Sequence, residues 1–285
     1  MNQNIDSENW DLIITPRKKW YDLQLADVWR YRDLITLFVR RDFVSRYKQT
    51  ILGPLWFLIQ PLFTSVVFTV IFGNIARLPT DGLPQLLFYM SGNVLWGYFS
   101  SCLTSTSSTF VANARLFGKV YFPRLVMPIS TVISNLITFS IQFLFFMAFY
   151  LYFFLSGADV SLTPWAFSLP LLILLMAGLG LGFGIIISSL TTKYHDLTYL
   201  VSFGVSLWMY GTPVIYPVSS IPENWRWVAD VNPVTPLIET FRAGFLGAGD
   251  ASWARLAYSG VFMLVVMFIG VVIFNRVEKT FIDTV

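Results

Sequence analysis

The chain has 285 residues, of which 55% are hydrophobic, 18% aromatic and only 12% charged. Soluble domains carry roughly 25% charged residues, so this composition excludes an ordinary soluble enzyme. The 35 Lys, Arg, Asp and Glu residues are also unevenly spread, because 16 of them lie within the first 54 positions. The rest of the chain is therefore expected to be surrounded by lipid.

Long uncharged segments divide this remainder. A helix that crosses a membrane needs about 20 apolar residues, and each segment can hold one. Runs such as Ile141 to Leu155 do not alternate as the strands of a β-barrel would. We therefore predict an all-α membrane protein with six transmembrane helices, near Leu55–Ala76, Leu86–Val111, Leu125–Leu155, Pro164–Thr192, Leu197–Tyr216 and Leu256–Asn275.

The basic residues predict the orientation of these helices. With six spans, 15 of the 19 Lys and Arg residues fall on the side of the two termini. Because cytoplasmic loops are enriched in basic residues, both termini are expected to lie in the cytoplasm. Residues 1–54 are then a cytoplasmic segment, 55–276 the transmembrane domain and 277–285 a cytoplasmic tail. The net charge of +3 suits anionic lipid headgroups, and no nucleic-acid partner is expected.

Two segments on the predicted cytoplasmic side combine basic and apolar residues. The first has the spacing of an amphipathic helix on the inner membrane face, which could be an anchor or a docking element: Tyr31, Leu34, Ile35 and Phe38. The second, Asn113 to Arg124, is short, basic and aromatic. Its apolar side chains need cover, which either lipid or a protein groove could provide.

Small and hydroxyl-bearing residues gather in two predicted spans. Glycines two and four residues apart favour close helix packing over a hinge in the fourth span: Gly178, Gly180, Gly182 and Gly184. Eight Ser and Thr residues crowd positions 100–109 of the second span. These hydroxyls could bond to helical carbonyls, or they could line a polar passage.

The longest outer loop, between Pro217 and Ala254, predicts two short helices that dip into the outer leaflet, at about Pro222–Ala229 and Pro233–Phe245. The chain is not expected to bind ATP or zinc itself. It has no phosphate-binding G-x-x-x-x-G-K-[ST] motif, and one His with one Cys cannot build a zinc site. No charged residue is near the centre of a predicted span, so any pumping needs an energy-supplying partner.

Several motifs occur in order from about Trp20 to the end of the chain. They are RRDF at 40–43, SRYKQT at 45–50, LGPLW at 52–56, QPL at 60–62, KVYFPR at 119–124, PVIY at 213–216, IPENWR at 221–226, NP at 232–233 and ETFR at 239–242. Together they resemble polysaccharide-export permeases of the ABC-2 class, which include the transmembrane subunits of O-antigen exporters. Two positions depart from that pattern, because Gly118 replaces a common basic residue and His195 a usual arginine.

The resemblance implies a homodimeric permease in the cytoplasmic membrane that works with two copies of an ATP-binding subunit. ATP and Mg²⁺ would be held by that subunit, so this chain is expected to bind no cofactor and to be no enzyme. The substrate would be a lipid-linked polysaccharide such as O-antigen. Docking to the ATP-binding subunit would involve Arg115, Leu116, Phe117, Lys119, Tyr121 and Phe122. An outer gate would involve Pro213, Tyr216, Trp225, Asn232, Pro233, Glu239 and Arg242.

Aromatic rings can contact the apolar faces of sugars without fixing one geometry. Six aromatic residues lie within the spans beside hydroxyl or amide residues and are candidates for a channel lining or, alternatively, for interfacial belts and helix packing: Trp56, Trp96, Tyr98, Phe99, Trp208 and Tyr210. An ABC-2 permease for teichoic-type polymers, lipids or drugs is an alternative function. A membrane enzyme of glycolipid assembly is a weaker one, because the outer acidic residues are scattered among three loops.

Overall fold

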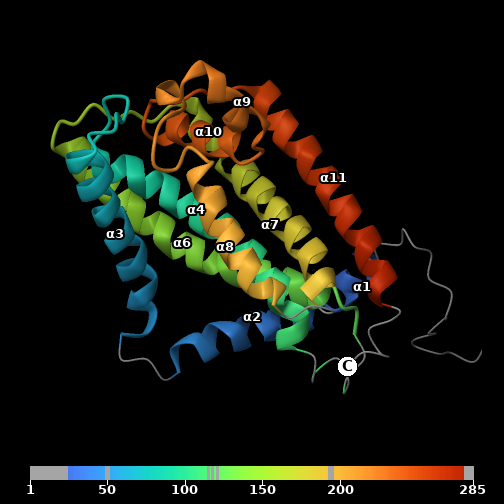
Figure 1. Cartoon of the computed structure of the whole chain (residues 1–285). Helices are drawn as coiled ribbons and strands as arrows, with labels where there is room; N and C mark the ends of the chain where they lie inside the picture. Colours follow the sequence, from blue (N-terminus) through green and yellow to red (C-terminus); the bar gives the residue numbers. More distant parts are fainter. Residues whose placement is uncertain are drawn as a thin grey trace, which may run out of the picture.

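In a computed structural model, the chain forms a bundle of long tilted helices with short helices at both ends (Figure 1). The structure describes residues 25–48, 52–113, 116, 119, 122–191 and 196–278. Over these residues it contains helices, turns and loops but no strand. The predicted all-α class is therefore confirmed for the described part of the chain.

A helix occupies the position of each predicted span. These helices are α3 (Trp56–Phe68) with a π-helical extension (Thr69–Ile75), α4 (Gln85–Ala112), α6 (Val126–Leu155), α7 (Leu169–Thr191) after a 3₁₀ turn (Pro164–Ser168), α8 (Leu197–Tyr210) and α11 (Trp253–Glu278). Four segments among the described residues are long and apolar enough to cross a membrane: Trp56–Ile75, Val126–Leu155, Pro164–Thr191 and Trp253–Phe274.

The remaining two helices, α4 and α8, do not meet that standard, each for its own reason. The 28 residues of α4 make a helix about 42 Å long, but many of them are polar. They lie against α3, α6, α7 and α8 instead of lipid. α8 has only 14 residues, so the prediction that the fifth helix continues to Tyr216 is wrong. It ends at Tyr210 because Pro213 cannot donate the next helical hydrogen bond.

Glycines allow α7 to pack closely against two neighbours. A Cβ atom at Gly180 would lie 2.6 Å from the Cβ of Cys102 on α4, and Gly184 faces the same helix. Gly178 and Gly182 face α11 in the same way. Because each contact leaves no room for a side chain, the prediction that these glycines serve packing is confirmed.

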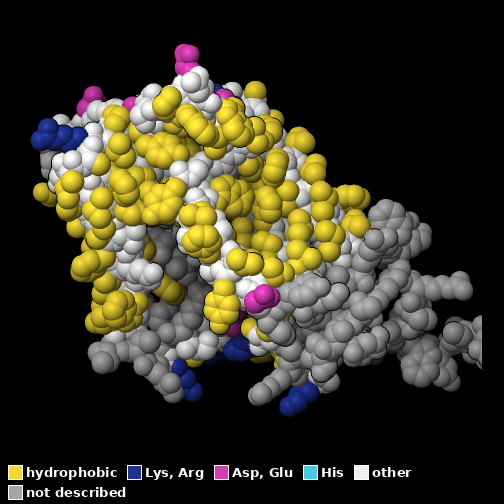
Figure 2. All heavy atoms as spheres, in the orientation of Figure 1, with side chains coloured by type: hydrophobic (Ala, Val, Ile, Leu, Met, Phe, Trp, Pro, Cys, Tyr) yellow, Lys and Arg dark blue, Asp and Glu magenta, His cyan; other side chains and the backbone are white. Residues whose placement is uncertain are grey.

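The chain between α8 and α11 forms a cap at one end of the bundle (Figure 1). It contains two 3₁₀ turns (Val218–Ser220 and Glu223–Trp225), α9 (Arg226–Val231) and α10 (Thr235–Phe245). The two short helices predicted in this loop are thus present. Every residue of α10 is buried, so this helix lies inside the cap and not on its surface. Figure 2 shows hydrophobic side chains over the middle of one face, with charged side chains mainly toward its two ends.

Helices α1 (Leu25–Arg30) and α2 (Arg32–Tyr47) lie across the opposite end of the bundle (Figure 1). Part of their apolar stripe packs against this chain. Val28 and Phe38 are buried in a cluster with Phe122, Val126 and Met127, at and just before the start of α6. The chain itself therefore covers part of this face, and contact of these helices with the membrane surface stays a prediction.

Candidate functional site

A cavity of about 340 Å³ lies between α3, α4 and α6, and Met209 of α8 completes its wall. The surface in Figure 2 is hollowed between α3 and α8. Among the described residues that line this cavity, none is charged, and the wall combines aromatic rings, amides and hydroxyls: Trp56, Phe57, Gln60, Pro61, Thr64, Asn93, Trp96, Gly97, Tyr98, Ser100, Ser101, Asn135, Thr138, Phe139 and Gln142.

Three of the six aromatic candidates line this cavity, namely Trp56, Trp96 and Tyr98. The others lie elsewhere. Phe99 is fully buried, and its ring centroid is 5.2 Å from that of Trp208, so both belong to the core between helices. Tyr210 is about half exposed at the end of α8 and does not line the cavity. The channel-lining role of all six stays a prediction.

Gln142 is held in the wall by a hydrogen bond to a backbone carbonyl that the proline in α3 leaves without a helical partner. Pro61 has no backbone N–H, so the carbonyl of Phe57, four residues earlier, loses its helical partner. Gln142 on α6 donates its Nε2 hydrogen to this carbonyl oxygen over 3.3 Å. Because a carbonyl oxygen only accepts, the bond also fixes which end of the Gln142 amide faces α3.

Asn93 is oriented in a similar way from α4. Its Nδ2 donates to the Oγ of Ser65 over 2.9 Å. Ser65 donates its own hydrogen to the carbonyl of Pro61 over 2.9 Å, so its oxygen is the acceptor for Asn93. Asn93 and Gln142 therefore both bind α3 through their NH₂ groups.

The crowded hydroxyls of α4 bond to helical carbonyls, and two of them also line the cavity; a passage at this face stays a prediction. Many donate to carbonyls one turn earlier, as Thr104 does to Ser100 over 2.7 Å and Thr109 does to Ser105 over 2.7 Å. Ser100 and Ser101 line the cavity. Thr106 is fully buried. The group is thus part tolerated by back-bonding and part exposed to the polar space.

The amide residues of the cavity were not among the predicted site residues; they are Gln60, Asn93, Asn135 and Gln142. A signal for them was present. Each lies in a span without charged residues, where exposing an amide to lipid costs free energy unless the amide faces protein or a polar space. Three different helices supply them, so only the folded chain brings them together.

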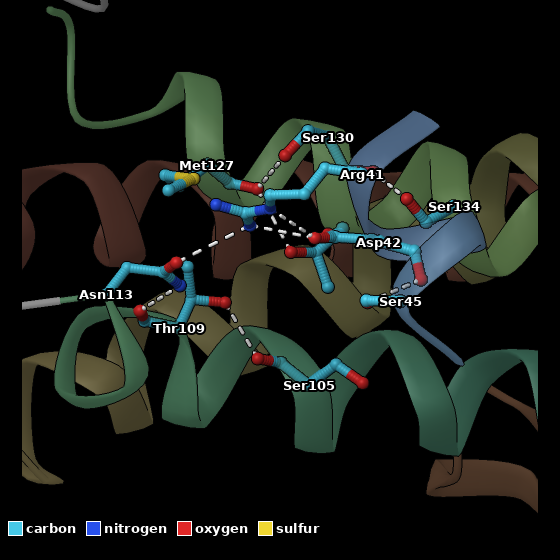
Figure 3. Close-up of polar contacts among 10 residues, drawn as sticks. Arg41, Asp42, Ser45, Ser105, Thr109, Asn113, Met127, Ser130 and Ser134 are labelled. Carbon is cyan, nitrogen blue, oxygen red and sulfur yellow. Dashed lines mark hydrogen bonds and ion pairs between the residues drawn. The ribbon is translucent and has the colours of Figure 1, made fainter. Parts of the chain in front are cut away.

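At the other end of the bundle, α2 is tied to the end of α4. The Nη2 of Arg41 lies 2.7 Å from Oδ1 of Asp42 and 3.5 Å from Oδ1 of Asn113, the residue that follows α4 (Figure 3). The guanidinium carbon also lies 4.9 Å from the centroid of the Phe38 ring. Asn113 begins the basic, aromatic loop, so this contact places the start of that loop against α2.

Of the six predicted docking residues, the structure describes three. Lys119 is exposed, and Leu116 is partly buried against the α2 cluster. Phe122 is 5% exposed, with its ring centroid 5.7 Å from that of Phe38, so its ring faces this chain. The other three docking residues and the two departures from the family pattern lie outside the described residues: Arg115, Phe117, Tyr121, Gly118 and His195.

Arg242 on α10, one of the predicted gate residues, is almost fully buried. Its Nη1 donates to the carbonyl of Pro213 over 2.6 Å and its Nη2 to the carbonyl of Val214 over 2.8 Å. The guanidinium carbon lies 3.7 Å from the centroid of the Phe88 ring on α4. Oε1 of Glu239 lies 3.4 Å from Nη1 of Arg242. The side chain thus connects α10, α4 and the turn after α8.

Burial acts on both members of this ion pair, which lies in α10, outside the six long helices. It lowers the pKa of Arg242 to about 10, against the attraction of Glu239, so the guanidinium stays charged at neutral pH. Burial also raises the pKa of the Glu239 carboxyl, against the attraction of Arg242. A charge held at this cost is stable only while its partners remain in place.

The other predicted gate residues divide into buried and exposed ones. Asn232 donates from Nδ2 to Thr212 Oγ1 over 2.8 Å, and Pro233 is also buried. The hydroxyl of Tyr216 donates to the carbonyl of Tyr210 over 2.8 Å. Trp225 is largely exposed. The structure brings Pro213, Glu239 and Arg242 into direct contact; a gating role for the set stays a prediction.

Comparison with known proteins relates the chain to membrane transport. A family model described as ABC-2 type transporter matches residues 33–246. The chain is 30% identical over 252 residues to an O-antigen export system permease protein of Klebsiella pneumoniae, covering 88% of this chain and 94% of that one. It is 28% identical to a protein of the same description from Myxococcus xanthus (78% and 83% covered). It is 24% identical to a polysialic acid transport protein of Escherichia coli (86% and 93% covered).

Proposed function

The chain belongs to the ABC-2 type transporter family, and we propose that it is the permease subunit through which a polysaccharide, such as O-antigen, is exported across the cytoplasmic membrane. The cavity between α3, α4 and α6 carries this proposal. Its uncharged wall of aromatic rings, amides and hydroxyls matches the apolar faces and hydroxyl edges of sugars. The relatives named for O-antigen export and polysialic acid transport support a polysaccharide as the substrate.

In this proposal all six long helices cross the membrane, with both termini in the cytoplasm. α4 is long enough, and its polar residues lie against neighbouring helices or line the cavity, so its modest hydropathy does not argue against a span. The short α8 would cross together with the turn that follows it. Two copies of the chain would enclose the passage, and α9 and α10 would form the gate at its outer mouth.

Energy would come from a separate ATP-binding subunit, in two copies. Support comes from the loop after α4, which is basic and aromatic, and from its contacts with α2 at the same end of the bundle. The partner would hold ATP and Mg²⁺, while this chain would convert its movement into a passage for the polymer. A lipid-linked polysaccharide is the substrate that such an arrangement would take.

Deletion of the gene tests the proposed function. We expect loss of polysaccharide from the cell surface and its accumulation inside the cell, measured by gel staining and by antibody labelling of intact cells. Plasmid-borne wild-type protein should restore the surface polymer. If the deletion strain keeps its surface polysaccharide unchanged, a permease for teichoic-type polymers, lipids or drugs becomes the better assignment.

Docking of the ATP-binding subunit is tested at Lys119, which is exposed and belongs to the loop. Lys119→Glu reverses a charge without disturbing the core, so we expect at least a fivefold loss of the co-purified subunit. Phe122→Asp would not be informative, because Phe122 packs against α2. The matched control is Arg226→Glu, the same reversal on exposed α9. Equal recovery of the subunit with both variants would contradict the docking role.

A further inference from the structure

Several polar side chains of the cavity wall donate a hydrogen to the chain itself and present their oxygen lone pairs to a ligand. Thr64 donates its hydroxyl hydrogen to the carbonyl of Gln60 over 3.0 Å, and Ser100 donates to the carbonyl of Gly97 over 3.2 Å. These hydroxyls therefore face the cavity with lone pairs only. The amides of Asn93 and Gln142 each donate one N–H to the protein, as described above.

The donors that remain on this wall carry no charge. They include the indole N–H groups of Trp56 and Trp96. Neither Lys nor Arg is present among the described residues that line the cavity. A ligand that enters thus meets amide and hydroxyl oxygens, neutral donors and aromatic faces, with no cation to balance a negative charge.

This balance of groups favours one class of sugar. The hydroxyls of an uncharged sugar donate to the wall oxygens, while its C–H faces lie on the Trp rings. A uronic acid, sialic acid or phosphate-bearing unit has to leave its hydration shell without gaining a cation. Its negative charge also meets the partial negative charges of the wall oxygens, which adds repulsion.

We propose that this cavity selects uncharged sugar units over acidic ones, an inference that rests on the proposed function and narrows its substrate class. Gln60, at the exposed edge of α3, is the position where the selection can be altered. A basic side chain there would supply the missing cation. Because Gln60 has no packing role in the core, the change should leave the fold intact.

The test uses the full-length protein in lipid nanodiscs and isothermal titration calorimetry with two probes, maltohexaose and hexagalacturonic acid. We expect wild-type protein to bind the neutral hexamer at least tenfold more tightly than the acidic one. Gln60→Arg should reduce this ratio to three or less. Gln60→Met removes the amide without adding charge and should keep the ratio. Asn224→Arg, in the exposed turn before α9, should also keep it and controls for general surface charge.

Equal or tighter binding of the acidic hexamer by wild-type protein would overturn the inference, as would the same ratio in wild-type protein and Gln60→Arg. If neither hexamer binds, the inference is overturned too, because the cavity would then not hold sugar units. These outcomes are distinct from failure of the proposed function, which is judged separately by the loss of surface polysaccharide in the deletion strain.

Discussion

Replacing Gly184 with leucine should leave little folded protein in the membrane. A Cβ atom at this position would overlap the side chain of Thr106 on α4, and it would lie 3.1 Å from the carbonyl oxygen of Leu103. Backbone cannot move aside as a flexible side chain can, so α7 and α4 would have to separate. Overpacking of a well-packed interior costs about 1–3 kcal/mol, and a whole leucine side chain belongs at the upper end. We expect at least a tenfold drop in the monodisperse protein recovered by size-exclusion chromatography in detergent.

The control for this experiment is the same substitution in another helix. Gly204 on α8 is exposed, and a Cβ atom there would meet no atom within 4 Å. Gly204→Leu should therefore give wild-type recovery, since leucine is also a better helix former than glycine. Full recovery of Gly184→Leu with normal export would show that the α4–α7 contact is looser than the structure has it.

Replacing Arg242 with methionine should be the most damaging change in the cap. The substitution leaves the carbonyls of Pro213 and Val214 without their donors and leaves Glu239 buried without its cation. Removal of one partner of a buried ion pair costs about 3–5 kcal/mol. For a chain of this size, 1 kcal/mol corresponds to roughly 2–4 °C, so the apparent melting temperature should fall by roughly 6–20 °C. Thermal unfolding of purified protein, followed by tryptophan fluorescence, measures the change.

Two further variants separate the buried charge from the loss of contacts. Arg255→Met removes an ion pair with Asp250 in which Nη1 and Oδ2 are 2.7 Å apart. Both side chains are far more exposed than those of Arg242 and Glu239, so the substitution should cost at most about 1 kcal/mol. Adding Glu239→Gln to Arg242→Met removes the unpaired carboxylate and should recover part of the lost stability. An equal shift of the melting temperature for Arg242→Met and Arg255→Met would contradict the structural role of Arg242.

The positions of the helices could be predicted from the sequence because isolated charges mark where the chain leaves the hydrocarbon. The third predicted span, Leu125–Leu155, differs from α6 by one residue. The fifth was predicted too long, because uncharged residues alone do not show where a helix ends. There the turn after Tyr210 is held by hydrogen bonds from Arg242 and Asn232, which lie 20 to 30 residues later in the chain.

The surroundings of each face were harder to predict than the helices themselves. The apolar stripe of α2 has the periodicity expected of a membrane-surface helix, but Phe122 and Met127 cover part of it. Periodicity shows that a face needs cover and not what provides it. The cavity was out of reach for the same reason. Its amides come from α3, α4 and α6, and the bond between Gln142 and Phe57 depends on a proline in a different helix.

The glycine contacts of α7 also limit which helices can move. Gly180 on one face and Gly182 on the other lie against backbone atoms of α4 and α11, so these three helices form a rigid frame in which a small displacement would cause atomic overlap. α3 is different, since a proline interrupts its hydrogen bonding and a π-helix follows it. Asn93 of α4 and Gln142 of α6 each join it to their helix by one amide hydrogen bond. A passage that widens and narrows during transport would therefore change at α3, while α4, α7 and α11 keep their spacing.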